Sequence, residues 1–272
     1  MPTMGLPVSL VLINKATDPA VAQQLPAIAI ALYIQSQRDH GPVWGVFTSA
    51  VRIDVEANLK PGEWSLIIAD NSDQAGALGY HDVNSQGMPQ GWAFSETAKQ
   101  GGMTLSQVIS HEMLEMFDDA GINLAAYNSQ NVFVAYETAD PVQDQTYVIA
   151  VPHDPANPDS TATVPVVVSN FVYPSWFEGF HQPGSVPFDH LGSLQQPFQL
   201  SAGGYISVFT NGGWQQIFGS QQSQDSYQPR NRVPRRRRRF EAPPPAALAA
   251  QSVDTPFRNV LGIHVPVPGA AT

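Results

Sequence analysis

The chain has 272 residues, a net charge of −10 and 43% hydrophobic residues, which is a globular composition with enough apolar surface for one sizeable core. Cysteine is absent, which excludes disulfides, Cys-ligated zinc and a thiol nucleophile. No apolar run approaches the length of about 18 residues that a transmembrane helix needs. The first residues lack the basic region of a secretory signal, so we expect a cytoplasmic or particle-associated protein.

Charge is segregated along the chain. Residues 1–224 carry 5 Lys and Arg against 20 Asp and Glu, whereas residues 225–272 carry 8 against 3. Between Lys99 and Arg230 there is no Lys or Arg, yet this span holds 12 carboxylates. Carboxylates that have no Lys or Arg side chain nearby either face water or hold a metal cation.

The first hundred residues alternate between strand and helix patterns. A β-rich apolar run at 6–13 predicts a buried strand, and the apolar spacing of 18–39, with Pro19 in its first turn, predicts a helix that packs on a sheet. Three further strands are expected at 45–55, 63–70 and 76–83. The last of these is rich in glycine, which favours a sheet edge that another backbone approaches closely.

A second helix is expected from Thr104 to about Asp118, with Thr104 as the N-cap and Gln107 as its capping-box partner. The period then changes to two, which predicts strands at 132–138, 146–151 and 164–174 and a hairpin over 204–218 around Asn211-Gly212. The fold class is therefore α+β, with one domain over residues 1–219. Residues 220–272, polar and then rich in Arg and Pro, are expected to form a disordered extension.

The stretch SHEMLEMFDDA (110–120) raises the functional question. His111, Glu115 and Asp118 share one stripe of the expected helix, because they stand at i, i+4 and i+7. One interpretation is an amphipathic helix with a solvated acidic face. Against it, Asp118 and Asp119 lie near the helix C-terminus, where the macrodipole disfavours negative charge, and no Lys or Arg stands at i±3 or i±4 of these carboxylates.

The other interpretation is a metal site. Side chains at i and i+4 project side by side, so His111 and Glu115 can bind one ion at about 2.0–2.2 Å. Glu112 then lies beside the ion and can act as a general base toward its water. The third ligand is expected from YETADPV, at Glu137 or Asp140. One imidazole with two carboxylates is a harder set than two histidines and a carboxylate, so Zn²⁺ is expected first, with Mn²⁺, Fe²⁺ or Ca²⁺ as alternatives.

The segments ALGYHD, SHEMLEM, YETADPV and VVVSNFVYPSWF, taken in this order, resemble a group of bacterial and phage-encoded proteins of the HExxE, zincin-like metallopeptidase type. The resemblance covers roughly residues 8–219. It implies a zincin-like fold, a mixed twisted sheet with a backing helix and an active-site helix, followed by a β-rich half. That helix would line a cleft beneath the edge strand at 76–83. This chain departs from the group at Ala139, where a cysteine is common, and this argues against a thiol ligand.

Two other residues and one basic run are candidates. His81, on the expected edge strand, would stabilise an oxyanion or hold substrate, although a lone strand histidine is more often structural. His190, next to Asp189 in sequence, is a candidate fourth metal ligand or a candidate hydrogen-bond partner of a metal ligand. The run Arg235 to Arg239 would contact polyanions non-specifically or lie on the acidic body.

Two functions follow. The first is a zinc-dependent metallopeptidase with a peptide or protein substrate, in which His111 and Glu115 bind the metal and Glu112 activates water. The second is a non-catalytic zincin-like binding protein, or a structural component of a virion or other particle, anchored by its arginine tail.

Overall fold

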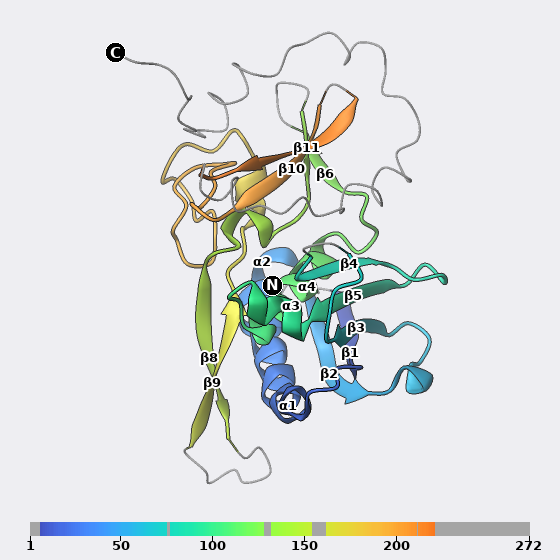
Figure 1. Ribbon diagram of the computed structural model, residues 1–272. Helices are drawn as coiled ribbons and strands as arrows, with labels where there is room; N and C mark the ends of the chain where they lie inside the picture. Colours follow the sequence, from blue (N-terminus) through green and yellow to red (C-terminus); the bar gives the residue numbers. More distant parts are fainter. Residues whose placement is uncertain (1–5, 75–76, 128–131, 154–161, 211, 221–272) are drawn as a thin grey trace. The chain divides into compact units, whose positions relative to one another are not determined.

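The computed structural model describes residues 6–74, 77–127, 132–153, 162–210 and 212–220 (Figure 1). The chain divides into two compact units. The first contains Met1–Ile122 and Thr146–Ser169, and the second contains Asn123–Gln145 and Asn170–Thr272. Helices and strands are mixed in the described part, which confirms the α+β class. The basic extension with Arg235 to Arg239 lies outside the described residues.

A five-stranded mixed sheet organises the first unit, in the order β2-β1-β3-β5-β4. Its strands are β1 (Leu6–Asn14), β2 (Val46–Asp54), β3 (Trp64–Ala69), β4 (Gly79–Val83) and β5 (Pro89–Phe94). The first, second, third and fifth are parallel, and β4 pairs antiparallel with β5 at the edge. The continuous apolar runs of β1 and β3 are buried, as parallel strands require.

The first helix begins at the N-cap and proline that its sequence provides. The Asp18 side chain accepts a hydrogen bond from the Ala20 backbone N–H, and Pro19 occupies the first turn of α1 (Pro19–Ile34). The backbone then continues as a π-helix, η1 (Gln35–His40), and a short helix, α2 (Gly41–Trp44). Helix α1 packs on β1 and β2 and on the hairpin of β8 (Thr146–Pro152) and β9 (Thr163–Ser169).

Helix α4 (Leu105–Asp118) follows the short helix α3 (Ser95–Gln100). The predicted N-cap is confirmed, because Thr104 Oγ1 accepts a hydrogen bond of 3.2 Å from the Gln107 backbone N–H. The helix packs on β4 and β5 of the sheet and on β9 of the hairpin, so all 14 of its residues are buried. The interpretation as a helix with a solvated acidic face is therefore wrong.

The second unit contains a four-stranded antiparallel sheet in the order β11-β10-β7-β6. Its strands are β6 (Ala125–Tyr127), β7 (Phe133–Ala135), β10 (Tyr205–Thr210) and β11 (Gly213–Phe218). Thr210 pairs with Gly213, and Gly212 between them has a φ of +80°, which confirms the predicted hairpin. The 3-10 turn η3 (Asp140–Val142) follows β7, and the 3-10 turn η4 (Pro174–Phe177) precedes β10.

Some elements differ from the sequence prediction. The strand expected at 132–138 is only three residues long, and the strand expected at 164–174 ends at Ser169. Strands β5 and β6 and helix α3 were not expected from the apolar pattern. Among the described residues, no helix is long and apolar enough to cross a membrane.

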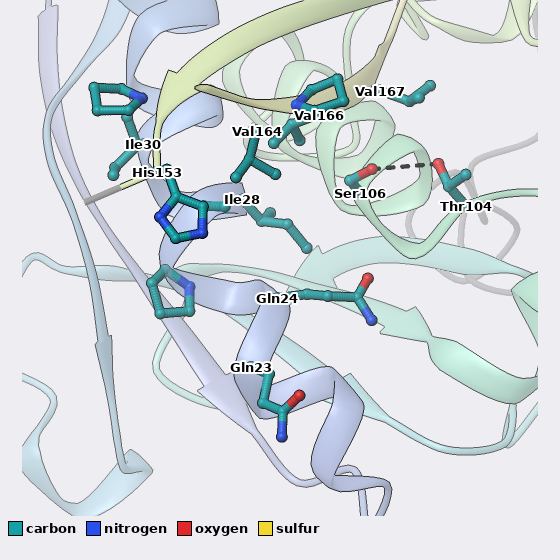
Figure 2. Close-up of a pocket in the computed structure, with 14 residues that line it drawn as sticks. Gln23, Gln24, Ile28, Ile30, Thr104, Ser106, His153, Val164, Val166 and Val167 are labelled. Atoms are coloured by element: carbon teal, nitrogen blue, oxygen red, sulfur yellow. Dashed lines mark hydrogen bonds between the residues drawn. The ribbon is translucent and has the colours of Figure 1, made fainter. Parts of the chain in front are cut away.

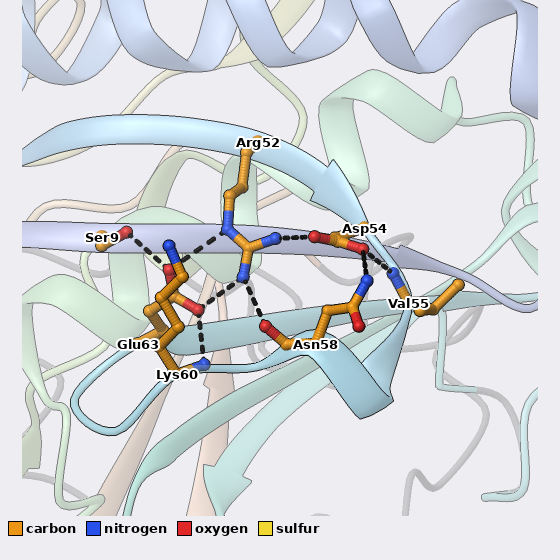
Figure 3. A network of polar contacts seen from close by, with 7 residues as sticks. All are labelled: Ser9, Arg52, Asp54, Val55, Asn58, Lys60 and Glu63. Atoms are coloured by element: carbon orange, nitrogen blue, oxygen red, sulfur yellow. Dashed lines mark hydrogen bonds and ion pairs between the residues drawn. The ribbon is translucent and has the colours of Figure 1, made fainter.

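An ion-pair network fixes the connection between β2 and β3, which includes the 3-10 turn η2 (Glu56–Asn58) (Figure 3). Arg52 donates to Glu63 from Nε at 3.1 Å and from Nη2 at 2.6 Å, and it also pairs with Asp54. The Lys60 backbone N–H donates to Glu63 Oε2 at 2.8 Å. The hydrogen bonds from Arg52, followed by that from Lys60, lower the pKa of Glu63 to about 2.

Candidate metal centre

Helix α4 approaches the sheet at two glycines. A Cβ on Gly79 of β4 would lie 2.6 Å from Glu112 Oε1 and 2.7 Å from the Trp92 carbonyl oxygen. A Cβ on Gly91 of β5 would lie 2.9 Å from Met116 Sδ. The absence of side chains at these two positions therefore lets α4 lie against the sheet, with the Glu112 carboxylate directly on the edge strand.

Sheet register directs His81 toward the same helix. Gly79 pairs with Ala93 and His81 pairs with Gly91, so these residues share one face of the β4–β5 ladder. Tyr80 pairs with Trp92, and their rings stack at 4.6 Å between centroids on the other face. Because Gly79 contacts α4, His81, two residues further along β4, also projects toward α4.

The result is a compact group of His81, His111, Glu112 and Glu115, which we name the His–Glu cluster. His111 Nε2 lies 3.1 Å from Glu115 Oε1. His81 Nδ1 lies 3.6 Å from Glu112 Oε2 and 3.7 Å from Glu115 Oε2. All four side chains are buried, and the exposed fraction of the Glu115 side chain is 0%. Of the six residues predicted for the site, the structure brings these four together within the first unit.

The donor set of the His–Glu cluster fits a divalent cation. Buried carboxylates are costly unless a cation or hydrogen bonds compensate their charge, and the sequence supplies no Lys or Arg from 100 to 229. At bond lengths of about 2.0–2.2 Å, two ligands of a tetrahedral ion lie about 3.3–3.6 Å apart, close to the separations observed here. Among the described residues, two groups of His and acidic side chains could hold a metal ion, and both contain Glu115.

Glu112 is placed differently from Glu115. It belongs to neither of the two possible metal-binding groups among the described residues. Its Oε1 lies against the backbone of Gly79, and its Oε2 faces His81. Glu112 is thus a buried carboxylate that lies next to the residues of these groups without belonging to either group among the described residues.

The remaining predicted ligands belong to the second unit. Glu137 follows β7, and Asp140 begins the 3-10 turn η3. Both are buried, with exposed fractions of 9% and 1%. The assignment of either residue as the third ligand stays a prediction.

His190 has a structural environment. Its ring stacks on Phe171, with 5.2 Å between centroids and 12° between planes, and its Nδ1 lies 3.4 Å from the Tyr173 hydroxyl. Asp189, next in sequence, accepts hydrogen bonds from Asn170 Nδ2 and from the Leu194 backbone N–H, both at 2.8 Å. These contacts favour a role in folding the second unit.

Asp118, at the end of α4, has a histidine partner from another element. His40 Nε2 lies 3.0 Å from both Asp118 oxygens, and His40 Nδ1 lies 3.0 Å from the Val46 carbonyl oxygen. Both side chains are fully buried. Since a carbonyl oxygen only accepts, Nδ1 donates to Val46, and the Nε2 edge of the ring faces the Asp118 carboxylate. Asp118 is therefore held by His40, which no spacing within the α4 sequence could indicate.

The π-helix carries a second contact to α4. Ser110 Oγ donates to Gln35 Oε1 at 2.8 Å, Gln35 Nε2 donates to the Ser169 carbonyl at 3.0 Å, and the Ser169 N–H donates back to Ser110 Oγ at 3.0 Å. This closed ring joins η1, α4 and β9. In the same π-helix, Asp39 accepts from the Tyr147 hydroxyl at 2.8 Å, and burial together with the Asp39 charge raises the pKa of Tyr147.

A pocket of about 430 Å³ lies elsewhere in the first unit (Figure 2). Helix α1, the start of α4 and the β8–β9 hairpin line it, with Ile28, Val164 and Val166 on its apolar side and Gln24 and His153 among its polar groups. None of the four residues of the His–Glu cluster lines this pocket.

Among the described residues, the His–Glu cluster gathers the residue types that metal-assisted hydrolysis uses, on one helix and one edge strand. Comparisons of the chain with protein-family models, with curated proteins and with solved structures give no match.

Proposed function

We propose that the protein is a metal-dependent hydrolase of the zincin-like type, with a peptide or protein as its substrate. The observation that carries this proposal is the burial of His111, Glu112 and Glu115 on a helix packed against an antiparallel edge strand. The mixed sheet with β4 at its edge agrees with the arrangement that the resemblance of the sequence implies.

His111 and Glu115 hold the metal ion in this proposal, and Glu137 or Asp140 supplies a third ligand. A divalent ion bound there would lower the pKa of a coordinated water and polarise a substrate carbonyl. Glu112 accepts the proton from the attacking water and passes it to the leaving amine. Its contact with Gly79 fixes the carboxylate for this role, because Oε1 has no room to move toward β4.

Zinc is the first candidate, because imidazole nitrogen and carboxylate oxygen at these separations suit it. A site rich in carboxylates also accepts Mn²⁺, Fe²⁺ or Ca²⁺. An extended peptide is the proposed substrate because β4 is an edge strand, and an edge strand can pair with an added chain through its backbone groups.

The test compares wild type with Glu112→Gln in a peptide-library cleavage assay and in elemental analysis of the purified protein. We expect Glu112→Gln to abolish cleavage and to retain the metal content of wild type. Glu96→Gln, on α3, is the control and should keep both. If Glu112→Gln loses both its metal and its cleavage activity, Glu112 is a ligand. If the wild type binds no metal after zinc is added, the proposal is refuted.

A second candidate is a non-catalytic binding protein of a particle. The observation that favours it is the run Arg235 to Arg239, which follows an acidic stretch of the sequence that has no Lys or Arg from 100 to 229. In that case any metal would be structural, with all coordination positions filled by protein. Co²⁺ substitution distinguishes the two, because the absorption spectrum of an open site changes when azide or a hydroxamate is added and that of a closed site does not.

A further inference from the structure

The pocket of about 430 Å³ lies between α1, the β8–β9 hairpin and the start of α4 (Figure 2). Helix α1 supplies Gln23, Pro26, Ala27 and Ile30, which stand at i, i+3, i+4 and i+7 and therefore share one stripe of the helix. Residues 164–167 of β9 supply another wall. All 14 lining residues belong to the first unit, so the pocket is built within one compact body.

The pocket has a buried apolar wall and an open side. Ile28 of α1 and Val166 of β9 line it, and their exposed fractions are only 3% and 5%. Ala27, which also lines it, is partly exposed and carries only a methyl group. A larger side chain at that position would occupy space that is now open to a ligand.

The charge of the lining differs from that of the chain. Residues 1–224 carry 20 Asp and Glu, yet none of the 14 lining residues is Asp, Glu, Lys or Arg. The polar lining groups are two amides, two hydroxyls and the imidazole of the exposed His153. Burial of a charge without a partner costs far more than burial of a neutral group that forms a hydrogen bond. The lining therefore favours an uncharged ligand.

The amides and hydroxyls retain hydrogen-bonding capacity. Thr104 Oγ1 and Ser106 Oγ lie 3.3 Å apart and share one hydrogen bond (Figure 2). Whichever of them donates, the other hydroxyl keeps its proton for a ligand. Gln24 Nε2 donates to the Ala20 carbonyl at 3.0 Å, which leaves Gln24 Oε1 able to accept from a ligand. The pocket thus offers a donor and an acceptor beside an apolar wall.

We propose that this pocket binds a small uncharged amphiphile, a molecule with an alkyl or aryl body and a hydroxyl or amide head. Its volume lies within the range of about 300–1,000 Å³ that is usual for ligand pockets, which are mostly apolar with a few polar groups. The inference goes beyond the proposed hydrolase function and does not depend on it, because no residue of the His–Glu cluster lines the pocket.

The first measurement is a titration of the ¹⁵N-labelled protein with 1-octanol, followed by two-dimensional NMR. Saturable shifts are expected for the backbone amides of Ala27, Ser106 and Val166. The affinity should increase from 1-hexanol to 1-octanol by about fourfold per methylene, since each methylene leaves water. Octanoate and octylamine have the same chain with a charged head, and they should bind at least about tenfold more weakly.

The second measurement locates the site with a matched pair of variants. Ala27→Phe places a ring in the pocket and should weaken 1-octanol binding by at least about tenfold, the factor for lost contact with about two methylenes. Ala22→Phe adds the same ring at an exposed position of α1 outside the lining and should bind like wild type. Circular dichroism melting checks that each variant is folded. If Ala27→Phe is unfolded, Val164→Phe fills the pocket from β9.

Each contrary result overturns a defined part of the inference. An absence of saturable shifts up to the solubility limit of 1-octanol overturns the binding site. Octanoate or octylamine binding as tightly as 1-octanol overturns the uncharged class of ligand. Equal affinity for 1-octanol in wild type and in a folded pocket-filling variant places the binding elsewhere. The cleavage assay is independent of all three results.

Discussion

Gly79 and Glu112 are in contact across the boundary between the edge strand and the buried helix, and there is no space for a methyl group between them. Gly79→Ala should therefore push the Glu112 carboxylate away from its position or force β4 outward. We expect a loss of about 1–3 kcal/mol in the free energy of unfolding, as for other overpacking substitutions, and a decrease in any hydrolytic activity. Urea denaturation and the cleavage assay measure the two effects.

Gly213→Ala is the matched control for that substitution. A Cβ on Gly213 would meet nothing within 4 Å, and its φ is not in the left-handed region. Its stability and activity should stay close to wild type. Equal losses in the two variants would mean that the contact between Gly79 and Glu112 has no special importance.

The buried pair of His40 and Asp118 should contribute strongly to stability. His40→Ala leaves the Asp118 carboxylate buried without its imidazole partner, which costs about 3–5 kcal/mol in comparable pairs. Asp118→Asn in the His40→Ala background removes the charge, so the double variant should be more stable than His40→Ala alone. A double-mutant cycle measured by urea denaturation gives the coupling, and additive losses would show that the two residues act independently.

The ring of Gln35, Ser110 and Ser169 predicts a second loss. Ser110→Ala removes a donor to Gln35 and an acceptor for the Ser169 N–H, all in a buried environment, so we expect about 1–3 kcal/mol of destabilisation. Thermal melting measures the change. Ser175→Ala, which removes a hydroxyl bonded to a carbonyl on the exposed surface, is the control and should cost less.

Glu63 predicts an acid-dependent change in stability. Its pKa in the folded state is lowered to about 2, below the ordinary value of 4.5, because Arg52 and the Lys60 N–H bind its charged form. The stabilisation is therefore complete above about pH 4.5 and is lost as the pH falls toward 2. Glu63→Gln should flatten this part of the curve of unfolding free energy against pH. Parallel curves for wild type and Glu63→Gln would contradict the assignment.

The third ligand predicted from the sequence is tested by Glu137→Gln and Asp140→Asn, made singly. The variant that removes a ligand should weaken zinc binding by at least about tenfold. Substitution of a residue that only hydrogen-bonds to a metal ligand already lowers metal affinity by about that factor. Zinc competition with a fluorescent chelator measures the affinity. Glu178→Gln, at an exposed carboxylate of the same unit, should have no effect. Wild-type affinity in both Glu137→Gln and Asp140→Asn would place the third ligand elsewhere.

Local patterns predicted those parts of the fold whose determinants are close in sequence. The apolar runs of β1 and β3, the start of α1 at Pro19 and the N-cap at Thr104 were predicted from their own residues. Strand β5 was missed because PQGWAF contains Pro and Gly and shows no alternation. Its strand conformation comes from pairing with β3 and β4, which are distant in sequence.

In the candidate site, too, the relationships between residues close in sequence were predicted and those between distant residues were not. The spacing of His111, Glu112 and Glu115 within one helix predicted that these three would gather. The approach of His81 depends on sheet register and on the small residues Gly79 and Gly91, and the pairing of Asp118 with His40 joins residues 78 positions apart. Those relationships follow only from the three-dimensional fold.

The burial of α4 has a consequence for the motions of the protein. The Ser110 ring holds the middle of the helix and the His40 pair holds its end, so α4 has no frayed turn between Ser110 and Asp118. Backbone amides of this segment should be among the slowest in the first unit to exchange with deuterated solvent, because their exposure requires global opening. The carboxylates and imidazoles would then be held in position before any ligand arrives, and binding would require little ordering of the helix.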